Sequence, residues 1–150
     1  MTKLIDKNKN GNGKGFDHQY EAKTINGDKV VIDSASGLMW QQSGSDNPMK
    51  YEAAKKWIDK LNQKGYAGFN DWRLPTIEET MSLMEPESME LYINPIFDKE
   101  QSWIWTADQV KGESRAAWVV DFEEADGSWR NVNHDSYVRA VRSGQSSYGG

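Results

Sequence analysis

Cysteine is absent from the 150-residue sequence, histidine occurs twice and proline four times. Without cysteine the chain has no disulfide framework, no thiol nucleophile and no thiolate metal site. His18 and His134 are too few for a histidine-cluster metal site, and they leave few general bases for neutral pH. No apolar run reaches the ~18–20 residues of a membrane span, and the first residues lack the apolar core of a signal peptide. We therefore expect no insertion into a membrane.

The charge of the sequence is acidic and unevenly distributed. Lys and Arg number 18 against 23 Asp and Glu, which gives a net charge of −5. Residues 1–15 carry +3, whereas residues 16–150 carry −8. An acidic chain binds phosphate backbones poorly, so we expect no nucleic-acid partner. The length suits one domain, and seven Trp, six Tyr and four Phe supply an aromatic-rich core.

Residues 1–19 are rich in Asn, Gly and Lys, and they are interpreted as a flexible basic leader. Part of this leader also follows the register of a calcium loop, with glycine at the sharp turn. An aspartate in place of the final glutamate, three lysines and the lack of a preceding helix favour the leader over the metal site. Calcium is the one cofactor that the sequence suggests. Its candidate ligands are Asp6, Asn8, Asn10, Asn12 and Asp17.

The first half of the domain combines a hairpin with a helix. Residues 20–42 contain two β-branched or apolar runs around a turn at residues 34–37, which predicts a hairpin. Asn47 and Pro48 form a helix-start signal, and apolar residues then recur at helical spacing until Gly65. The sequence thus predicts a helix from about residue 48 to residue 64.

Residues 71–76 form the most specified corner of the sequence. Pro75 favours an extended residue before it, and Thr76 with Glu79 forms a capping box that begins a helix at residue 77. The spacing of Trp72 and Leu74 places both side chains on one face. We expect both to be buried, Arg73 to pair locally and the helix to run to about residue 84, where Pro86 stops it.

The last third of the sequence predicts a meander of strands at residues 103–106, 116–122, 129–132 and 137–142. Asp126 and Gly127 are expected to form one of the turns. Alternation in the last strand buries at least one arginine against carbonyls or a carboxylate, with Asp71 or Asp121 as candidate partners. The predicted fold class is α+β, with two helices packed on a twisted, mainly antiparallel sheet. Residues 144–150 are expected to be a disordered tail.

The order and spacing of eight short motifs make the chain resemble the Lcl-type C-terminal domain family, a bacterial and largely uncharacterised group, over about residues 27–144. The resemblance implies a C-type-lectin-like fold of the formylglycine-generating-enzyme branch for residues 20–143. It carries no catalytic residues, and the cysteines of that enzyme are absent here. The motifs are Gly37-Leu38-Met39-Trp40, Ala53-Ala54, Leu61-Asn62, Gly65-Tyr66-Ala67-Gly68-Phe69, Asp71-Trp72-Arg73-Leu74-Pro75-Thr76, Trp105-Thr106, Val120-Asp121-Phe122 and Tyr137-Val138-Arg139-Ala140-Val141-Arg142.

The resemblance also implies binding of a glycan or a surface protein, outside the cytoplasm in the periplasm or on the cell surface. A similar lectin-like group, the variable receptor domains of diversity-generating retroelements, displays its binding residues near the C-terminal strands. The corresponding segment here offers aromatic faces and adaptable polar groups. In an alternative interpretation Trp129 is a core residue beside a solvated loop. The candidate ligand-binding residues are Trp129, Arg130, Asn131, Asn133, His134, Asp135 and Tyr137.

Two other functions stay open at this point. A hydrolase-like enzyme would use His134 with Asp135, Asp121 or Glu123, although no nucleophile motif surrounds the nearby serines. A purely structural domain of a larger surface protein would need no site. We predict a non-catalytic recognition module, and the sequence does not indicate its oligomeric state.

Overall fold

The architecture comes from a computed structural model that describes residues 18–86 and 91–143. The elements of this part, in chain order, are β1 (Tyr20–Ile25), β2 (Asp28–Asp33), β3 (Leu38–Gln41), α2 (Tyr51–Lys64), the 3-10 turn η1 (Tyr66–Gly68), α3 (Ile77–Met81), β4 (Trp103–Val110), β5 (Glu113–Asp121), β6 (Asp126–Asn131) and β7 (Val141–Arg142). The α+β class with two helices is confirmed. The possible calcium ligands of the leader and the tail at residues 144–150 lie outside the described residues.

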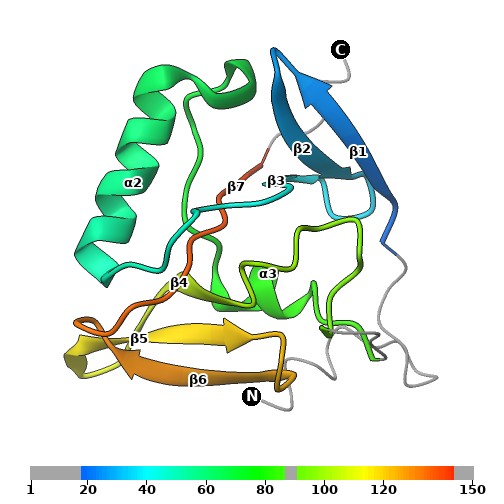
Figure 1. Ribbon diagram of the computed structural model, residues 1–150. Coiled ribbons are helices and arrows are strands. Elements are labelled where there is room, and N and C mark those ends of the chain that lie inside the picture. Colours follow the sequence, from blue (N-terminus) through cyan, green and yellow to red (C-terminus); the bar gives the residue numbers. More distant parts are fainter. Residues whose placement is uncertain (1–17, 87–90, 144–150) are drawn as a thin grey trace.

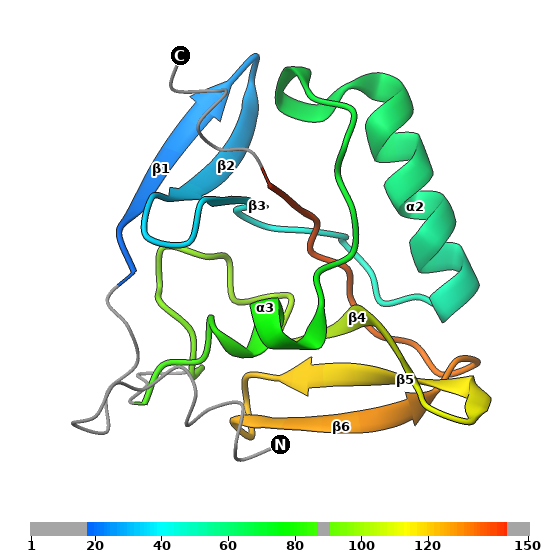
Figure 2. The ribbon, with the colours of Figure 1, turned by 180° about the vertical axis from the view of Figure 1, so that it is seen from behind.

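The strands form two antiparallel sheets in place of the single predicted sheet. One sheet has the order β1-β2-β3-β7 and the other the order β4-β5-β6. Figures 1 and 2 show the second sheet at the end of the molecule opposite to β1 and β2, with α2 along one side. The predicted hairpin of β2 and β3 is confirmed, with Asp33 opposite Leu38.

In the C-terminal segment, side chains take the place of the strand ladder at the backbone amides, whereas the carbonyls of Val138 and Ala140 still accept from backbone amides. Tyr137 still bridges to Ile104 of β4, and Val141 pairs with Trp40 of β3. Between these points the amide of Val138 donates to Ser45 Oγ at 3.0 Å, and that of Ala140 donates to Gln41 Oε1 at 2.8 Å. The predicted strand of residues 137–142 is therefore reduced to the two residues of β7, and the segment connects the two sheets.

Alternate residues of the central strands enter two separate cores. Met39 and Val119 belong to the first core, to which α2 contributes Ala54, Ile58 and Leu61. Their neighbours Trp40 and Val120 belong to the second core, together with residues of α3 and of the segment that follows it. Because neighbouring side chains point to opposite faces of a strand, these strands are buried on both faces. The central strands are the layer between the two cores.

Helix α2 begins at Tyr51, three residues after the predicted start. Met49, two residues before the helix, is held in a β bridge with Ser136, in which the amide of each residue donates to the carbonyl of the other at 2.8 and 2.9 Å. Because this pairing keeps the chain extended, Asn47 and Pro48 lie outside the helix. The predicted end is confirmed, since Gly65 adopts a left-handed conformation with φ of 67° and closes the last turn.

The corner at residues 71–76 has the predicted structure. Trp72 and Leu74 are buried, and the backbone of Trp72 exchanges hydrogen bonds of 2.8 and 2.9 Å with the side chain of Asn62. Thr76 and Glu79 form the capping box of α3. The helix is shorter than predicted and ends at Met81, because Met84 enters a β bridge with Ile93 before Pro86 is reached.

The turn before β6 lies upstream of the predicted position. Asp126 and Gly127 are the first residues of β6, paired with Asp121 and Val120. The chain reverses at residues 122–125, where one carboxylate oxygen of Asp121 accepts hydrogen bonds from the amides of Glu123 at 2.8 Å and Glu124 at 3.3 Å. This side-chain cap fixes the turn and leaves Asp126 and Gly127 extended.

Both arginines of the C-terminal segment are buried, which confirms the expectation for that strand. Arg142 donates to both carboxylate oxygens of Asp71 at 2.6 and 3.1 Å and lies over the ring of Phe69. Arg139 is fully buried and donates to backbone carbonyls, including those of Gln42 and of Asp98, the latter at 2.8 Å. The arginines join the C-terminal segment to three distant parts of the chain.

Candidate functional site

Trp129 of β6 is the exposed large hydrophobic residue of the described part of the chain, with 62% of its surface accessible. Strand pairing sets Trp129 opposite Trp118 and sets Gly127 opposite Val120. The second core covers this face of the sheet at Val120, whereas Trp129 lies farther along the strand, where the core no longer reaches. Trp129 is a candidate contact residue, because tryptophan is enriched at interfaces and binding hot spots. The core interpretation of Trp129 is therefore wrong.

A cavity of about 490 Å³ opens beside Trp129. It is lined by residues of the β4–β5 hairpin and of β6. The hairpin turns at Gly112, whose φ of 80° favours glycine, and Val110 pairs with Glu113 across it. Pairing of Ala116 with Asn131 then brings β6 alongside. The lining residues are Val110, Glu113, Arg115, Ala116, Trp129 and Asn131.

The polar groups of the cavity are of mixed character and carry no net charge. Arg115 Nε lies 3.9 Å from Glu113 Oε1, and the same carboxylate oxygen accepts the amide of Arg115 at 2.9 Å. Both side chains are largely in solvent, so this pair contributes little to stability. Asn131 Oδ1 accepts the amide of Asn133 at 2.8 Å, which leaves the side-chain amide hydrogens as donors. The cavity thus offers donors and acceptors next to one aromatic face.

The structure divides the seven predicted ligand-binding residues among three places, which are the cavity, the back of the sheet and the turn after β6. Trp129 and Asn131 line the cavity. Arg130, which lies on the opposite face of β6, donates to the carbonyl of Asp135 at 3.3 Å. Tyr137 is half-buried and packs edge-on against Trp103, with ring centroids 5.1 Å apart. The Trp103 indole also donates to the carbonyl of Asp135, at 3.4 Å. These contacts hold the segment after β6 on the back of the sheet.

Asn133 and His134 lie in the exposed turn after β6. The amide of His134 donates to the carbonyl of Asn131 at 2.9 Å, so the turn is fixed by its backbone. In residues 18–86 and 91–143 no recorded hydrogen bond joins the His134 ring to the carboxylate of Asp121, Glu123 or Asp135. One oxygen of Asp121 is used instead to cap its own turn. The arrangement suits a solvated loop better than a catalytic pair.

Four cavity residues were missed by the sequence analysis, namely Val110, Glu113, Arg115 and Ala116. Their position depends on strand register, which shifts twice between Trp105 and Val110. Such irregularities move a side chain to the other face and leave no local sequence pattern. The one usable signal was Gly112, which follows an alternating strand and predicts a turn that brings its two flanks together.

A second polar cluster surrounds His18, the first described residue. Its Nδ1 lies 2.6 Å from Asp33 Oδ2, its Nε2 lies 2.6 Å from the carbonyl oxygen of Ser82, and its ring stacks on Tyr20. Burial lowers the His18 pKa, but the hydrogen bonds to Asp33 and Ser82 outweigh it and raise the pKa above its ordinary value. The Asp33 pKa is lowered to about 2, because bonds from His18, Gln19 and Ser36 outweigh the effect of burial. The cluster attaches residues 18 and 19, assigned to the leader, to the domain.

The described residues contain no group of three or more Asp, Glu or His side chains able to hold a metal ion. The candidate calcium ligands Asp6, Asn8, Asn10, Asn12 and Asp17 lie outside these residues. Within the same described part, none of the helices has the length and apolar character needed to span a membrane.

Two antiparallel sheets, two helices and a surface cavity beside an exposed tryptophan characterise this α+β domain. A comparison with protein families matches residues 29–142 to the Lcl C-terminal domain. The chain belongs to this family, a bacterial and largely uncharacterised one whose domains are of an extracellular type. The chain matches none of the curated proteins with which it was compared.

Proposed function

We propose that this domain is a non-catalytic recognition module that binds a glycan or a surface protein at the exterior of the bacterial cell. The proposal includes a C-type-lectin-like fold of the formylglycine-generating-enzyme branch, and the combination of two helices with two antiparallel sheets supports it. The Lcl family membership supports the extracellular setting. The binding site is the cavity beside Trp129, with Asn131 as its second predicted member.

The exposure of Trp129 is the observation that carries the proposal. A Trp side chain buries up to ~250 Å², so covering the 62% now in solvent would remove roughly 100–150 Å² from water. At ~25 cal/mol per Å², that burial is worth about 2–4 kcal/mol. This is the contribution of a typical binding hot spot, and tryptophan is enriched at such positions.

The geometry favours binding over catalysis. Hydrolysis would need a base positioned by a partner, and His134 lies in an exposed turn away from Asp121, whose carboxylate caps a turn of its own. The cavity itself contains only one carboxylate, Glu113, which is paired with Arg115. Its groups are those of a surface that positions a ligand through hydrogen bonds and stacking.

The test is an array of glycans and bacterial and host surface proteins, probed with the 150-residue chain and its Trp129→Ala variant. We expect at least one class of spot to bind the wild-type chain and to lose about 10-fold or more of its signal with Trp129→Ala. Substitution at this exposed position should leave the melting temperature within about 2 °C of the wild-type value.

The matched control is His134→Ala, which removes another exposed ring from the same region but lies outside the cavity. We expect it to bind like the wild-type chain. Equal signals from the wild type and Trp129→Ala would overturn the proposed site, and loss of signal with His134→Ala alone would move recognition to the turn after β6.

A further inference from the structure

We infer that the ligand of the Trp129 cavity is an uncharged sugar ring, which stacks on the indole and is held by Glu113, Arg115 and Asn131. The inference rests on the proposed recognition function and specifies the chemical class of its ligand. It follows from the size of the cavity, the mixed polarity of its walls and the charge of the domain around it.

The size and shape of the cavity suit a small rigid ligand. Its volume of about 490 Å³ lies in the lower half of the range of small-molecule pockets, which is ~300–1,000 Å³. Trp129 forms part of the wall, and Val110 and Ala116 add a small apolar area. A pyranose ring presents an apolar C–H face that matches such a wall, while its hydroxyl groups project toward the rim.

The polar groups of the cavity match hydroxyl groups better than any other chemistry. A hydroxyl both donates and accepts, so two adjacent hydroxyls can accept from Arg115 and donate to Glu113 across their 3.9 Å separation. Asn131 adds donors on the neighbouring strand. An apolar side chain of a protein ligand would instead displace the water that hydrogen-bonds to Glu113 and Arg115. It would offer these charged groups no hydrogen bonds in return, which is unfavourable.

The charges of the site disfavour an anionic ligand. The positive charge of Arg115 is offset by Glu113, whose Oε1 lies 3.9 Å from Arg115 Nε. The chain from residue 16 onward carries a net charge of −8, so the field around the domain repels polyanions. Sulfated and carboxylated sugars therefore meet a carboxylate in the site and a negative surface outside it.

The experiment is a titration of the ¹⁵N-labelled 150-residue chain, followed by the indole N–H signals of its tryptophans. The Trp129 signal is identified by its absence from Trp129→Phe. The probes are glucose, galactose, mannose and N-acetylglucosamine, each up to about 100 mM because ligands of few atoms bind weakly. A heparin-derived tetrasaccharide is the anionic probe. We expect at least one neutral sugar to shift the Trp129 and Asn131 side-chain signals saturably, and less than about twofold change in Kd between 0.05 and 0.5 M NaCl.

Glu113→Gln distinguishes the two charge classes by the sign of its effect. It weakens a neutral sugar about 3- to 10-fold, because a neutral amide accepts hydroxyl protons less strongly than a carboxylate does. It would strengthen binding of an anion by removing a like charge. Lys55→Gln on the exposed face of α2 is the charge control and leaves Kd unchanged.

The outcomes separate this inference from the function on which it rests. Saturable shifts by a neutral sugar, weakened by Glu113→Gln, support both. Trp129-dependent binding of heparin tetrasaccharide or of a protein, with no response to any neutral sugar, overturns the inference and leaves the recognition function standing. If neither the titrations nor the array shows binding that depends on Trp129, both fail.

Discussion

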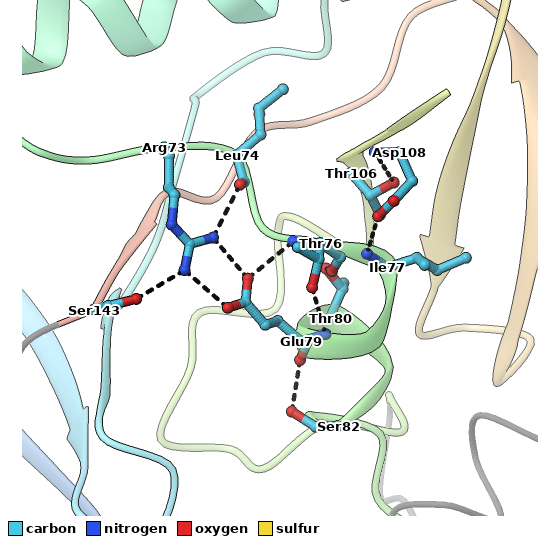
Figure 3. A network of polar contacts seen from close by, with 10 residues as sticks. All are labelled: Arg73, Leu74, Thr76, Ile77, Glu79, Thr80, Ser82, Thr106, Asp108 and Ser143. Atoms are coloured by element: carbon cyan, nitrogen blue, oxygen red, sulfur yellow. Dashed lines mark hydrogen bonds and ion pairs between the residues drawn. The ribbon is translucent and has the colours of Figure 1, made fainter. Parts of the chain in front are cut away.

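Glu79 of α3 connects Arg73 and Thr76 in the corner at residues 71–76, as Figure 3 shows. The effect of its removal on the stability of the domain can be estimated from these contacts. Its carboxylate accepts two hydrogen bonds from the Arg73 guanidinium, at 2.7 and 2.8 Å, and one from the amide of Thr76 at 2.9 Å. Arg73 in turn donates to the hydroxyl of Ser143 at 2.9 Å. Glu79 thus anchors the start of α3 to the end of the described chain.

We expect Glu79→Ala to lower the free energy of unfolding by about 1.5–3 kcal/mol. Loss of the backbone half of the capping box accounts for ~0.5–1 kcal/mol. The bidentate ion pair has side chains 38% and 21% exposed, so we place it between surface and buried pairs, at ~1–2 kcal/mol. Glu79→Gln keeps the bond from Thr76 and loses the charge, and it should cost about half as much. Urea unfolding followed by tryptophan fluorescence measures both values.

At acidic pH the wild-type chain should no longer be more stable than Glu79→Gln. Burial raises the Glu79 pKa, but the Arg73 and Thr76 hydrogen bonds outweigh it, so its pKa lies below the ordinary value of 4.5. A lowered pKa contributes stability above pH 4.5, which is lost as the pH falls through the lowered value. Glu124→Ala removes an equal charge from an exposed turn and is the control. A cost below about 0.5 kcal/mol for Glu79→Ala, or equal costs for Ala and Gln at pH 7, would refute this reasoning.

Two further predictions concern the N-terminal side of the domain. The raised pKa of His18 adds stability that is fully present below pH 6.5 and is lost as the pH rises through the raised value. The Asp33 pKa of about 2 adds stability that is present above pH 3.8 and is lost as the pH falls to that lowered value. His18→Gln should therefore lower the melting temperature most between about pH 4 and 6.5 and least near pH 9; an equal loss at all pH values would contradict the pairing. For the leader we expect no change in melting temperature with millimolar calcium, and a rise abolished by Asp6→Ala would establish the calcium loop instead.

The corner at residues 71–76 was predictable because its rules are local. The position of Pro75, the spacing of Thr76 and Glu79 and the alternation of Trp72 and Leu74 each act within four residues. The buried state of an arginine in the C-terminal strand was predictable on the same ground, and Asp71 was one of its two candidate partners. Sequence reasoning succeeded where neighbouring residues decide the structure.

The cavity was only partly predictable because its walls depend on distant pairing. Trp129 and Asn131 were named from composition, whereas Glu113 and Arg115 reach the site through a hairpin with two register shifts. The turn assigned to Asp126 and Gly127 was wrong for a related reason. Asp126 and Gly127 are a strong local turn signal, but the chain already reverses at residues 122–125, where the Asp121 carboxylate caps the turn. No short-range rule decides which of these two positions forms the turn.

The central position of residues 136–142 has a consequence for the synthesis of this domain. This segment pairs with residues 49, 104 and 73 and with β3, and its hydrogen bonds to Gln41, Ser45 and Asp71 span 99, 93 and 71 residues of sequence. Of the described residues, a ribosome makes this segment last, although it lies in the middle of the fold. Neither core can close until nearly the whole described chain has emerged, so the domain folds as one unit once this segment has been made.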